Sequence, residues 1–228
     1  MPGLGSIINS VAIFIGALVG KFAGGKLPDK VIKTVMSALG LFVAFLGVQM
    51  SLDTQNVIVV LVSLVLGTIV GSIIDIEKAL DKLGDKIKKR FDNKGESTFT
   101  QGFVAASIIY CVGPMAIMGA LNDGLTGDIT ILITKAIIDG ISSIAFASTL
   151  GIGVGFSAFL VLIYQGLISI FAKWIAPIMT TGVITEMTAV GGIILMAIGV
   201  NIVLNTKIKT GNMLPALFFA IAIASFVV

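Results

Sequence analysis

The sequence contains no histidine and only one cysteine, Cys111, among its 228 residues. Without histidine, the commonest metal ligand and the usual proton shuttle at neutral pH are both missing. A single cysteine cannot form a disulfide within the chain. Beyond Ser142, Ser143 and Asp139, no side chain stands out as a nucleophile with a neighbouring base. We therefore expect no cofactor, no metal site and no enzymatic activity.

Charged residues are also scarce, at 12% of the chain, whereas 57% of the residues are hydrophobic and the mean hydropathy is +1.11. One soluble core cannot enclose so many apolar side chains, so lipid must act as the solvent. We expect an all-α, polytopic membrane domain of about eight transmembrane helices. Its main partner is the lipid bilayer, and nothing in the sequence resembles a nucleic-acid-binding module.

Hydropathy and turn residues predict where the chain crosses the membrane. The predicted spans cover about 4–19, 35–52, 57–74, 103–121, 129–150, 152–170, 187–204 and 213–228. Segment 76–91 has apolar residues on one helical face and charges elsewhere, which predicts a helix at the membrane surface or against the protein's own cytoplasmic face. Most of the 15 basic residues fall in the links after spans one, three and seven. This bias predicts that both termini lie outside.

The first and last three predicted spans show a weak similarity when the chain is aligned with itself so that Gln49 meets Asn201. Other matched pairs include Gly40 with Gly192 and Gly47 with Gly199. We divide the domain into a first three-helix repeat (1–75), a cytoplasmic amphipathic helix and loop (76–95), a central broken-helix region (96–151) and a second three-helix repeat (152–228). The repeats start on opposite sides, which predicts the inverted topology of many secondary transporters. Gln49 and Asn201 would then both be buried amides, which either bind a solute or form hydrogen bonds between helices.

Lys135 and Asp139 are four residues apart in the apolar fifth span, so they share one helical face and can form an ion pair. The standard helical rise places Asp139 roughly 15 Å below the outer turn, close to the middle of the membrane. A lone charge there would cost several kcal/mol. The pair therefore indicates solute coordination or proton coupling, or else a purely structural bridge between helices.

Gly113 and Pro114 interrupt the fourth span, because proline lacks a backbone N–H and clashes with the preceding turn. Two half-helices would present partial charges to an ion or a polar solute, although a simple kink for packing is the alternative. Other candidate site residues are the polar ones of the same region: Asn122 and Asp123 at the outer turn, where they could attract cations, Ser142, Ser143 and Gln165.

Seven short motifs resemble one known family. They are CVGPMAI (111–117), DGLTGD (123–128), KAIIDG (135–140), FASTLGIGV (146–154), LIYQG (162–166), EMTA (186–189) and NMLPAL (212–217). They are similar to those of the YqgA-like family of prokaryotic inner-membrane proteins, whose function is unknown. The resemblance covers essentially the whole chain. It implies a location in the bacterial cytoplasmic membrane and a transport role without an assigned substrate.

The residues and the resemblance together favour a small secondary transporter or permease for a small polar solute or ion. A broken helix, a pair of charges inside the membrane and a candidate inverted repeat coincide in the same chain. Two alternatives remain open. One is a passive channel formed by a homo-oligomer, and the other is a membrane scaffold or sensor that transports nothing.

Overall fold

The computed structural model describes residues 2–24, 29–79, 82 and 99–227, and these residues form helices without strands. The helices are α1 (Leu4–Gly24), α2 (Asp29–Leu52), α3 (Val57–Ile74), α5 (Phe99–Cys111), α6 (Pro114–Thr126), α7 (Thr130–Leu150), α8 (Gly153–Ile170), α9 (Ala172–Ile175), α10 (Thr181–Leu204) and α11 (Ala216–Val227), with a 3₁₀ turn η1 (Thr210–Met213). The predicted amphipathic segment 76–95 lies outside the described residues except for 76–79 and 82.

Among the described residues, seven segments are long and apolar enough to cross a membrane: α1, α2, α3, α7, α8, α10, and η1 together with α11 (Thr210–Val227). Helices α5 and α6 make an eighth crossing if the bent pair is one span. The axes of α5 and α6 differ by 56°. The predicted all-α polytopic fold is therefore confirmed. One boundary was wrong: the seventh span begins at Thr181 and not at about 187, because the Thr180 side chain accepts a hydrogen bond from the Val183 N–H and caps the helix there.

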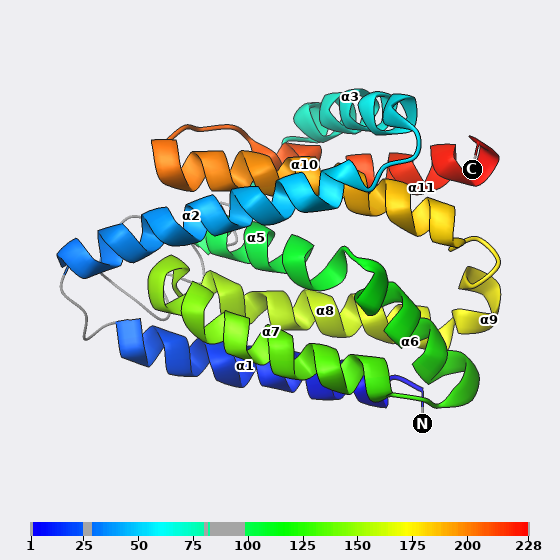
Figure 1. Cartoon of the computed structure of the whole chain (residues 1–228), viewed down its shortest axis with the longest axis horizontal. Coiled ribbons are helices and arrows are strands. Elements are labelled where there is room, and N and C mark those ends of the chain that lie inside the picture. The colour runs from blue at the N-terminus through cyan, green and yellow to red at the C-terminus, as the bar shows by residue number, and fades with distance from the viewer. Residues whose placement is uncertain (1, 25–28, 80–81, 83–98, 228) are drawn as a thin grey trace.

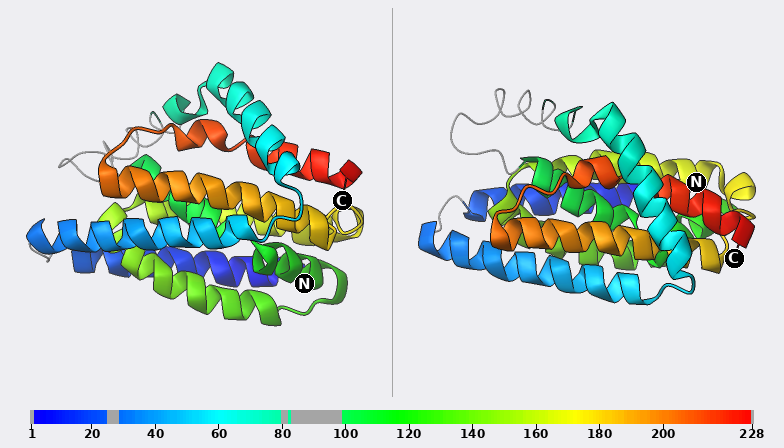
Figure 2. Two further views of the ribbon diagram at one scale, coloured as in Figure 1. Left: turned by 45° about the horizontal axis from the view of Figure 1, so that its top comes forward. Right: turned by 90° about the horizontal axis from the view of Figure 1, so that it is seen from above.

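The helices form two groups (Figure 1). In one group α1, α7 and α8 lie side by side, and α5 and α6 follow α8. In the other group α2 packs along α10, while α3 crosses α11 obliquely (Figure 2). Both chain ends lie at the same end of the bundle, next to the α6–α7 and α2–α3 connections (Figures 1 and 2). The side of the membrane that this end faces stays a prediction.

Glycines allow α1 and α7 to touch backbone to backbone. A Cβ on Gly16 would overlap the carbonyl oxygen of Gly140, and a Cβ on Gly20 would overlap that of Ile144. The Gly16-x-x-x-Gly20 spacing thus forms a close helix interface, because small residues let two backbones approach each other. A step of four residues along α1, from Gly16 to Gly20, matches a step of four residues in the same direction along α7, from Gly140 to Ile144. The two helices therefore run parallel.

The bent pair α5–α6 follows α8 along its whole length. At one end a Cβ on Gly153 would overlap the Phe99 carbonyl, and at the other a Cβ on Gly124 would overlap the Ser169 carbonyl. The pair therefore reaches from one end of the bundle to the other, as a single crossing does and a re-entrant loop does not. The break falls at its middle, beside the centre of the bundle.

Candidate functional site

Helix α7 holds the ion pair that the sequence predicts. The Lys135 Nζ lies 3.0 Å from both carboxylate oxygens of Asp139. Only 7% of Lys135 and 2% of Asp139 is exposed, although both lie on a helix whose other face is open to lipid. Asp139 is about 14 Å along α7 from its first residue at the standard rise of 1.5 Å per residue. The two charges are therefore enclosed by protein near the middle of the span.

Two other helices supply amides to this pair. The Asn9 Nδ2 on α1 donates to Asp139 Oδ2 at 3.1 Å and to Gln165 Oε1 on α8 at 3.3 Å. Asn9 and Gln165 are both 0% exposed. The close approach of α1 to α7 brings the short Asn9 side chain within reach of the carboxylate. Of the predicted site residues, Gln165 is thus joined to Lys135 and Asp139 through Asn9.

Tyr110, near the end of α5, connects the break to the same cluster. Its hydroxyl lies 2.9 Å from Ser143 Oγ and accepts a hydrogen bond from Ser142 Oγ at 3.3 Å. Ser142 Oγ also lies 3.0 Å from the carbonyl oxygen of Asp139. The Lys135 Nζ is 6.0 Å from the centre of the Tyr110 ring, within the range of a cation–π interaction. We call Asn9, Tyr110, Lys135, Asp139, Ser142, Ser143 and Gln165 the central polar cluster.

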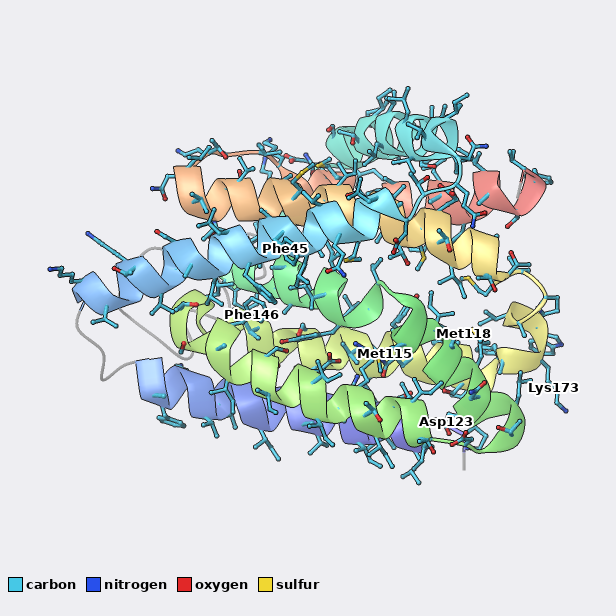
Figure 3. All side chains as sticks on the ribbon, viewed as in Figure 1. Phe45, Met115, Met118, Asp123, Phe146 and Lys173 are labelled. Carbon is cyan, nitrogen blue, oxygen red and sulfur yellow. The ribbon has the colours of Figure 1, made fainter. Side chains whose placement is uncertain are left out.

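The predicted break in the fourth span is present beside this cluster. Helix α5 ends at Cys111, one residue after Tyr110 of the central polar cluster. Gly113 has φ 150° and ψ 156°, a conformation that favours glycine, and Pro114 is the first residue of α6. No side chain caps the start of α6, whose residues Met115 and Met118 project just past the break (Figure 3).

The break leaves the end of α5 without its usual backbone partners. The Val112 N–H still donates to the Ile108 carbonyl at 2.8 Å, but the next two positions are Gly113, whose backbone turns away, and Pro114, which has no N–H. The carbonyls of Ile109 and Tyr110 therefore lose the N–H groups that would continue the helix. This agrees with the prediction that Gly113 and Pro114 interrupt the fourth span.

Several buried polar atoms around the cluster have no hydrogen-bond partner among the described residues. Asn9 Oδ1 is an unused acceptor, and Gln165 Nε2 is an unused donor. Three hydroxyls on the same helices share this condition: Ser6, Ser107 and Tyr164. Buried polar groups are normally paired, and an unpaired one costs about 1–3 kcal/mol. The cluster therefore has more hydrogen-bonding capacity than its own residues use.

Asp123 does not lie at an open mouth, which corrects the expected role of the outer turn. Helix α6 continues to Thr126, and Asp123 faces inward with 1% exposure. Its Oδ2 accepts hydrogen bonds from the N–H groups of Gly3 at 3.0 Å and Gly5 at 3.3 Å, so it caps the start of α1 (Figure 3). Asn122 is half-buried on the same helix, away from the central polar cluster.

The acid of the outer turn that does meet water is Asp128. It is exposed, and its Oδ1 accepts a hydrogen bond from the Thr130 N–H at 2.9 Å. Hydrogen bonds from the side chain and then the backbone of Thr130 lower the pKa of Asp128 below its usual value. This carboxylate thus satisfies the backbone N–H of Thr130, the first residue of α7.

The proposed symmetry mates Gln49 and Asn201 are not two buried amides, and this expectation was wrong. Gln49 is exposed on α2. Asn201 is buried, but it bonds to the loop after α10: its Nδ2 donates to the Ile208 carbonyl at 2.8 Å, and its Oδ1 accepts from the Ile208 N–H at 3.0 Å. Asn201 lies one turn before the end of α10, so the returning chain satisfies it locally.

Sequence reasoning missed three buried residues that the structure brings into prominence. Asn9 and Tyr110 belong to the central polar cluster, and Glu186 is 0% exposed and accepts hydrogen bonds from Thr54 Oγ1 at 2.6 Å and the Gln55 N–H at 2.8 Å. A signal existed for each. Asn9 is the lone amide of the first span, and Tyr110 is one of two tyrosines. Glu186 directly precedes the predicted start of the seventh span at about 187 and is the lone acid of α10.

The grooves beside the cluster are apolar. One of about 410 Å³ lies between α2 and α7 and is lined by Leu39, Phe42, Ile138, Ile141, Ser142, Ala145 and Phe146. Another of about 400 Å³ follows the contact between α1 and α7. Both suit lipid chains better than a polar solute. Among the described residues no group of three or more acidic, cysteine or histidine side chains is placed to hold a metal ion.

Comparison with known proteins identifies relatives along the whole chain. The family "Protein of unknown function (DUF554)" matches residues 4–225. The uncharacterized membrane protein YdfK of Bacillus subtilis is 34% identical over 217 residues, which cover 93% of this chain and 92% of YdfK. The uncharacterized protein YqgA of Escherichia coli is 30% identical over 226 residues, or 97% and 96% of the two chains. No solved structure matches. The chain is a membrane protein that belongs to the DUF554 family.

Proposed function

We propose that the protein is a small secondary transporter or permease for a small polar solute or ion, and not an enzyme. It would act in the bacterial cytoplasmic membrane with both termini outside. The observation that carries this proposal is the enclosed Lys135–Asp139 pair beside a helix break, in a cluster whose amides have unused hydrogen-bonding atoms. Ionisable groups within a membrane span, next to a discontinuous helix, are typical of solute pathways.

The unused atoms are what favours transport over simple helix bonding. A cluster that only joined helices would be most stable with every donor and acceptor hydrogen-bonded, because a buried polar atom without a partner destabilises the network. Here Asn9 Oδ1 and Gln165 Nε2 have no hydrogen-bond partner in the described part of the chain, although both residues are 0% exposed. These atoms are available to a polar ligand that enters between α1, α7 and α8.

The packing of α2 against α10 supports the proposed inverted repeat. In the self-alignment Gly40 corresponds to Gly192 and Gly47 to Gly199. A twofold axis in the membrane plane would turn a contact between Gly47 and Gly192 into one between Gly40 and Gly199. Both contacts occur, since a Cβ on Gly192 or on Gly199 would lie 2.6 Å from the carbonyl oxygen of Gly47 or Gly40, respectively. Such repeats underlie alternating access in many transporters.

Transport requires the enclosed cluster to open. Exposures of 7% for Lys135 and 2% for Asp139 mean that the pair is shielded from both aqueous sides in this conformation. The Gly113–Pro114 break provides a hinge, because no α-helical hydrogen bond spans it from Pro114. We propose that α6 moves against α8 about this hinge and exposes the cluster to the end where the chain termini lie.

A structural scaffold is the second candidate, and one observation favours it. Lys135 and Asp139 already satisfy each other at 3.0 Å, and Asn9 links the carboxylate to α1. Such a pair can hold helices together without binding anything. The two candidates differ in what the loss of the carboxylate should do to solute flux.

Flux measurements in reconstituted vesicles test the proposal. Purified protein is placed in sealed vesicles, and uptake of a panel of radiolabelled amino acids, sugars and inorganic ions is compared for the wild type, Asp139→Asn and the matched control Asp128→Asn, whose carboxylate is exposed. We expect saturable uptake of at least one solute, at least tenfold slower in Asp139→Asn and unchanged in the control. Non-saturating conductance would indicate a channel. No flux for any solute, with Asp139→Asn only less stable, would support the scaffold.

A further inference from the structure

The central polar cluster is electrically neutral as a whole. Lys135 and Asp139 contribute one charge of each sign and contact each other, and the remaining members are amides and hydroxyls. A solute with a net charge would bring an uncompensated charge into a region without bulk water, which costs several kcal/mol. A solute with one positive and one negative group would leave the total charge at zero.

The break in the fourth span repeats this pairing of signs. The end of α5 carries the partial negative charge of unpaired carbonyls, and the start of α6 carries the partial positive charge of a helix N-terminus without a side-chain cap. Only Val112 and Gly113 separate these two helix ends. Tyr110, one residue before the end of α5, contacts Ser142 and Ser143 on α7, and its ring centre lies 6.0 Å from the Lys135 Nζ. Positive and negative partial charges therefore lie side by side next to the ion pair.

The unused hydrogen-bonding atoms also come as one acceptor and one donor. Asn9 Oδ1 can accept a hydrogen bond from an ammonium group, while Gln165 Nε2 can donate to a carboxylate. The two amides are joined by the 3.3 Å bond from Asn9 Nδ2 to Gln165 Oε1, so the unused atoms belong to neighbouring side chains. Both side chains are 0% exposed, which makes them interior groups and not part of a solvated surface.

From these three observations we propose that the transported solute is a small zwitterion of the amino-acid type, with an ammonium and an acidic group on the same or neighbouring carbons. The inference rests on the transport function proposed above. The solute would open the ion pair and replace it: its ammonium binds Asp139, Asn9 Oδ1 and the carbonyl end of α5, while its carboxylate binds Lys135, Gln165 Nε2 and the start of α6. Each buried charge keeps one opposite partner throughout.

Ligand-induced stabilisation of the purified full chain tests the charge type of the solute. The probes are three zwitterions (glycine, alanine and taurine) and their singly charged counterparts (acetate, propionate, methylammonium and ethylammonium), each at the same ionic strength. We expect at least one zwitterion to raise the Tm of the wild type by about 4 °C or more at saturation, and the singly charged probes to have no effect. A larger shift with a singly charged probe would overturn the proposal.

Two charge-deleting variants make the test sharper. Asp139→Asn leaves Lys135 without its carboxylate, so this variant should lose the response to zwitterions and gain one to acetate or propionate. Lys135→Gln should instead respond to methylammonium or ethylammonium. The control Asp128→Asn should behave as the wild type. If both variants fold and neither gains a response to the matching singly charged probe, the two charges do not hold the solute and the proposal is wrong.

A charge exchange covers the case in which the single variants unfold. Combining Lys135→Asp with Asp139→Lys retains one charge of each sign four residues apart, so the pair can still form. This variant should fold and keep some response to zwitterions; a folded variant without it counts against the proposal. The vesicle assay tests the proposed transport function separately from the charge type of the solute. Saturable, Asp139-dependent flux of an ion or a sugar, with no effect of zwitterions, would overturn the inference alone. Stabilisation by zwitterions without any flux would overturn transport and leave only a zwitterion-binding site.

Discussion

Removing one member of the buried ion pair should destabilise the protein strongly, whatever the protein transports. Asp139→Asn keeps the shape of the side chain but leaves the Lys135 ammonium, which is 7% exposed, without a carboxylate at 3.0 Å. Breaking a buried pair in this way costs about 3–5 kcal/mol. Polar interactions in membrane bundles are weaker by measurement, because the unfolded chain in detergent also finds partners. We therefore expect a loss of about 2–4 kcal/mol.

Removing both charges should restore much of this loss. Lys135→Met alone leaves Asp139, 2% exposed, with the Asn9 amide as its hydrogen-bond donor from another helix, and should also cost about 2–4 kcal/mol. Lys135→Met combined with Asp139→Asn buries no charge. The double variant should thus be more stable than the sum of the two single effects predicts, by about 2 kcal/mol or more.

Reversible unfolding in mixed micelles measures these differences through the helical circular dichroism signal as denaturing detergent is added. The control Asp128→Asn removes an exposed carboxylate and should leave the free energy of unfolding close to that of the wild type. Additive single effects, or a loss below about 1 kcal/mol for Asp139→Asn, would refute the reasoning. Either result would mean that water reaches the pair and that its partners do not matter to one another.

Three further predictions test the packing and the caps. Gly20→Val should unfold the chain or lower its free energy of unfolding by more than about 2 kcal/mol, because the new Cβ meets a backbone carbonyl of α7. The control Gly166→Ala has open space for its Cβ and should change this free energy by less than about 1 kcal/mol. Thermal unfolding compares the two variants. Glu186→Gln should lose about 1.5–3 kcal/mol by the same assay, since its two oxygens accept charge-assisted hydrogen bonds from the α2–α3 connection. Hydrogen bonds from Thr130 lower the pKa of Asp128. The ionised carboxylate therefore stabilises the fold at neutral pH, and this stabilisation is lost as the pH falls through the folded-state pKa. Asp128→Asn should flatten that part of a curve of stability against pH. An unchanged curve would show that the Asp128 cap does not stabilise the fold.

The helical spans could be predicted closely from sequence because their cause is local. In lipid each backbone N–H must be satisfied within its own segment, so a long apolar run becomes a helix whatever surrounds it. The third span, predicted at 57–74, is α3 (Val57–Ile74), and Asn56 caps it through its side chain. The break at Pro114 was predicted for an equally local reason, namely that proline lacks the N–H that a helix needs there.

The candidate site could be predicted only in part. The contact between Lys135 and Asp139 follows from their spacing on one helix. Asn9 and Gln165, which are 156 positions apart, meet because α1 lies between α7 and α8, and nothing in either segment specifies that arrangement. The position of Asp123 also depends on helix packing. Its polar turn favours exposure to water, but the start of α1 packs on Asp123 and its carboxylate caps that helix.

By itself the sequence determined that lipid surrounds the protein, where its helices lie, where the fourth span breaks and which two charges pair. These features follow from hydropathy, from a proline without a backbone N–H and from i,i+4 spacing, all of which act within a few turns of the chain. Only the tertiary structure decided which polar atoms meet. It paired Asn9 with Asp139, and it buried Asp123 against the start of α1 and Glu186 against the α2–α3 connection. It left Gln49 on the surface. The physical reason is that helix packing in lipid depends on close contact between small residues distant in sequence, such as Gly16 and Gly140, and those contacts set the neighbours of every buried polar group.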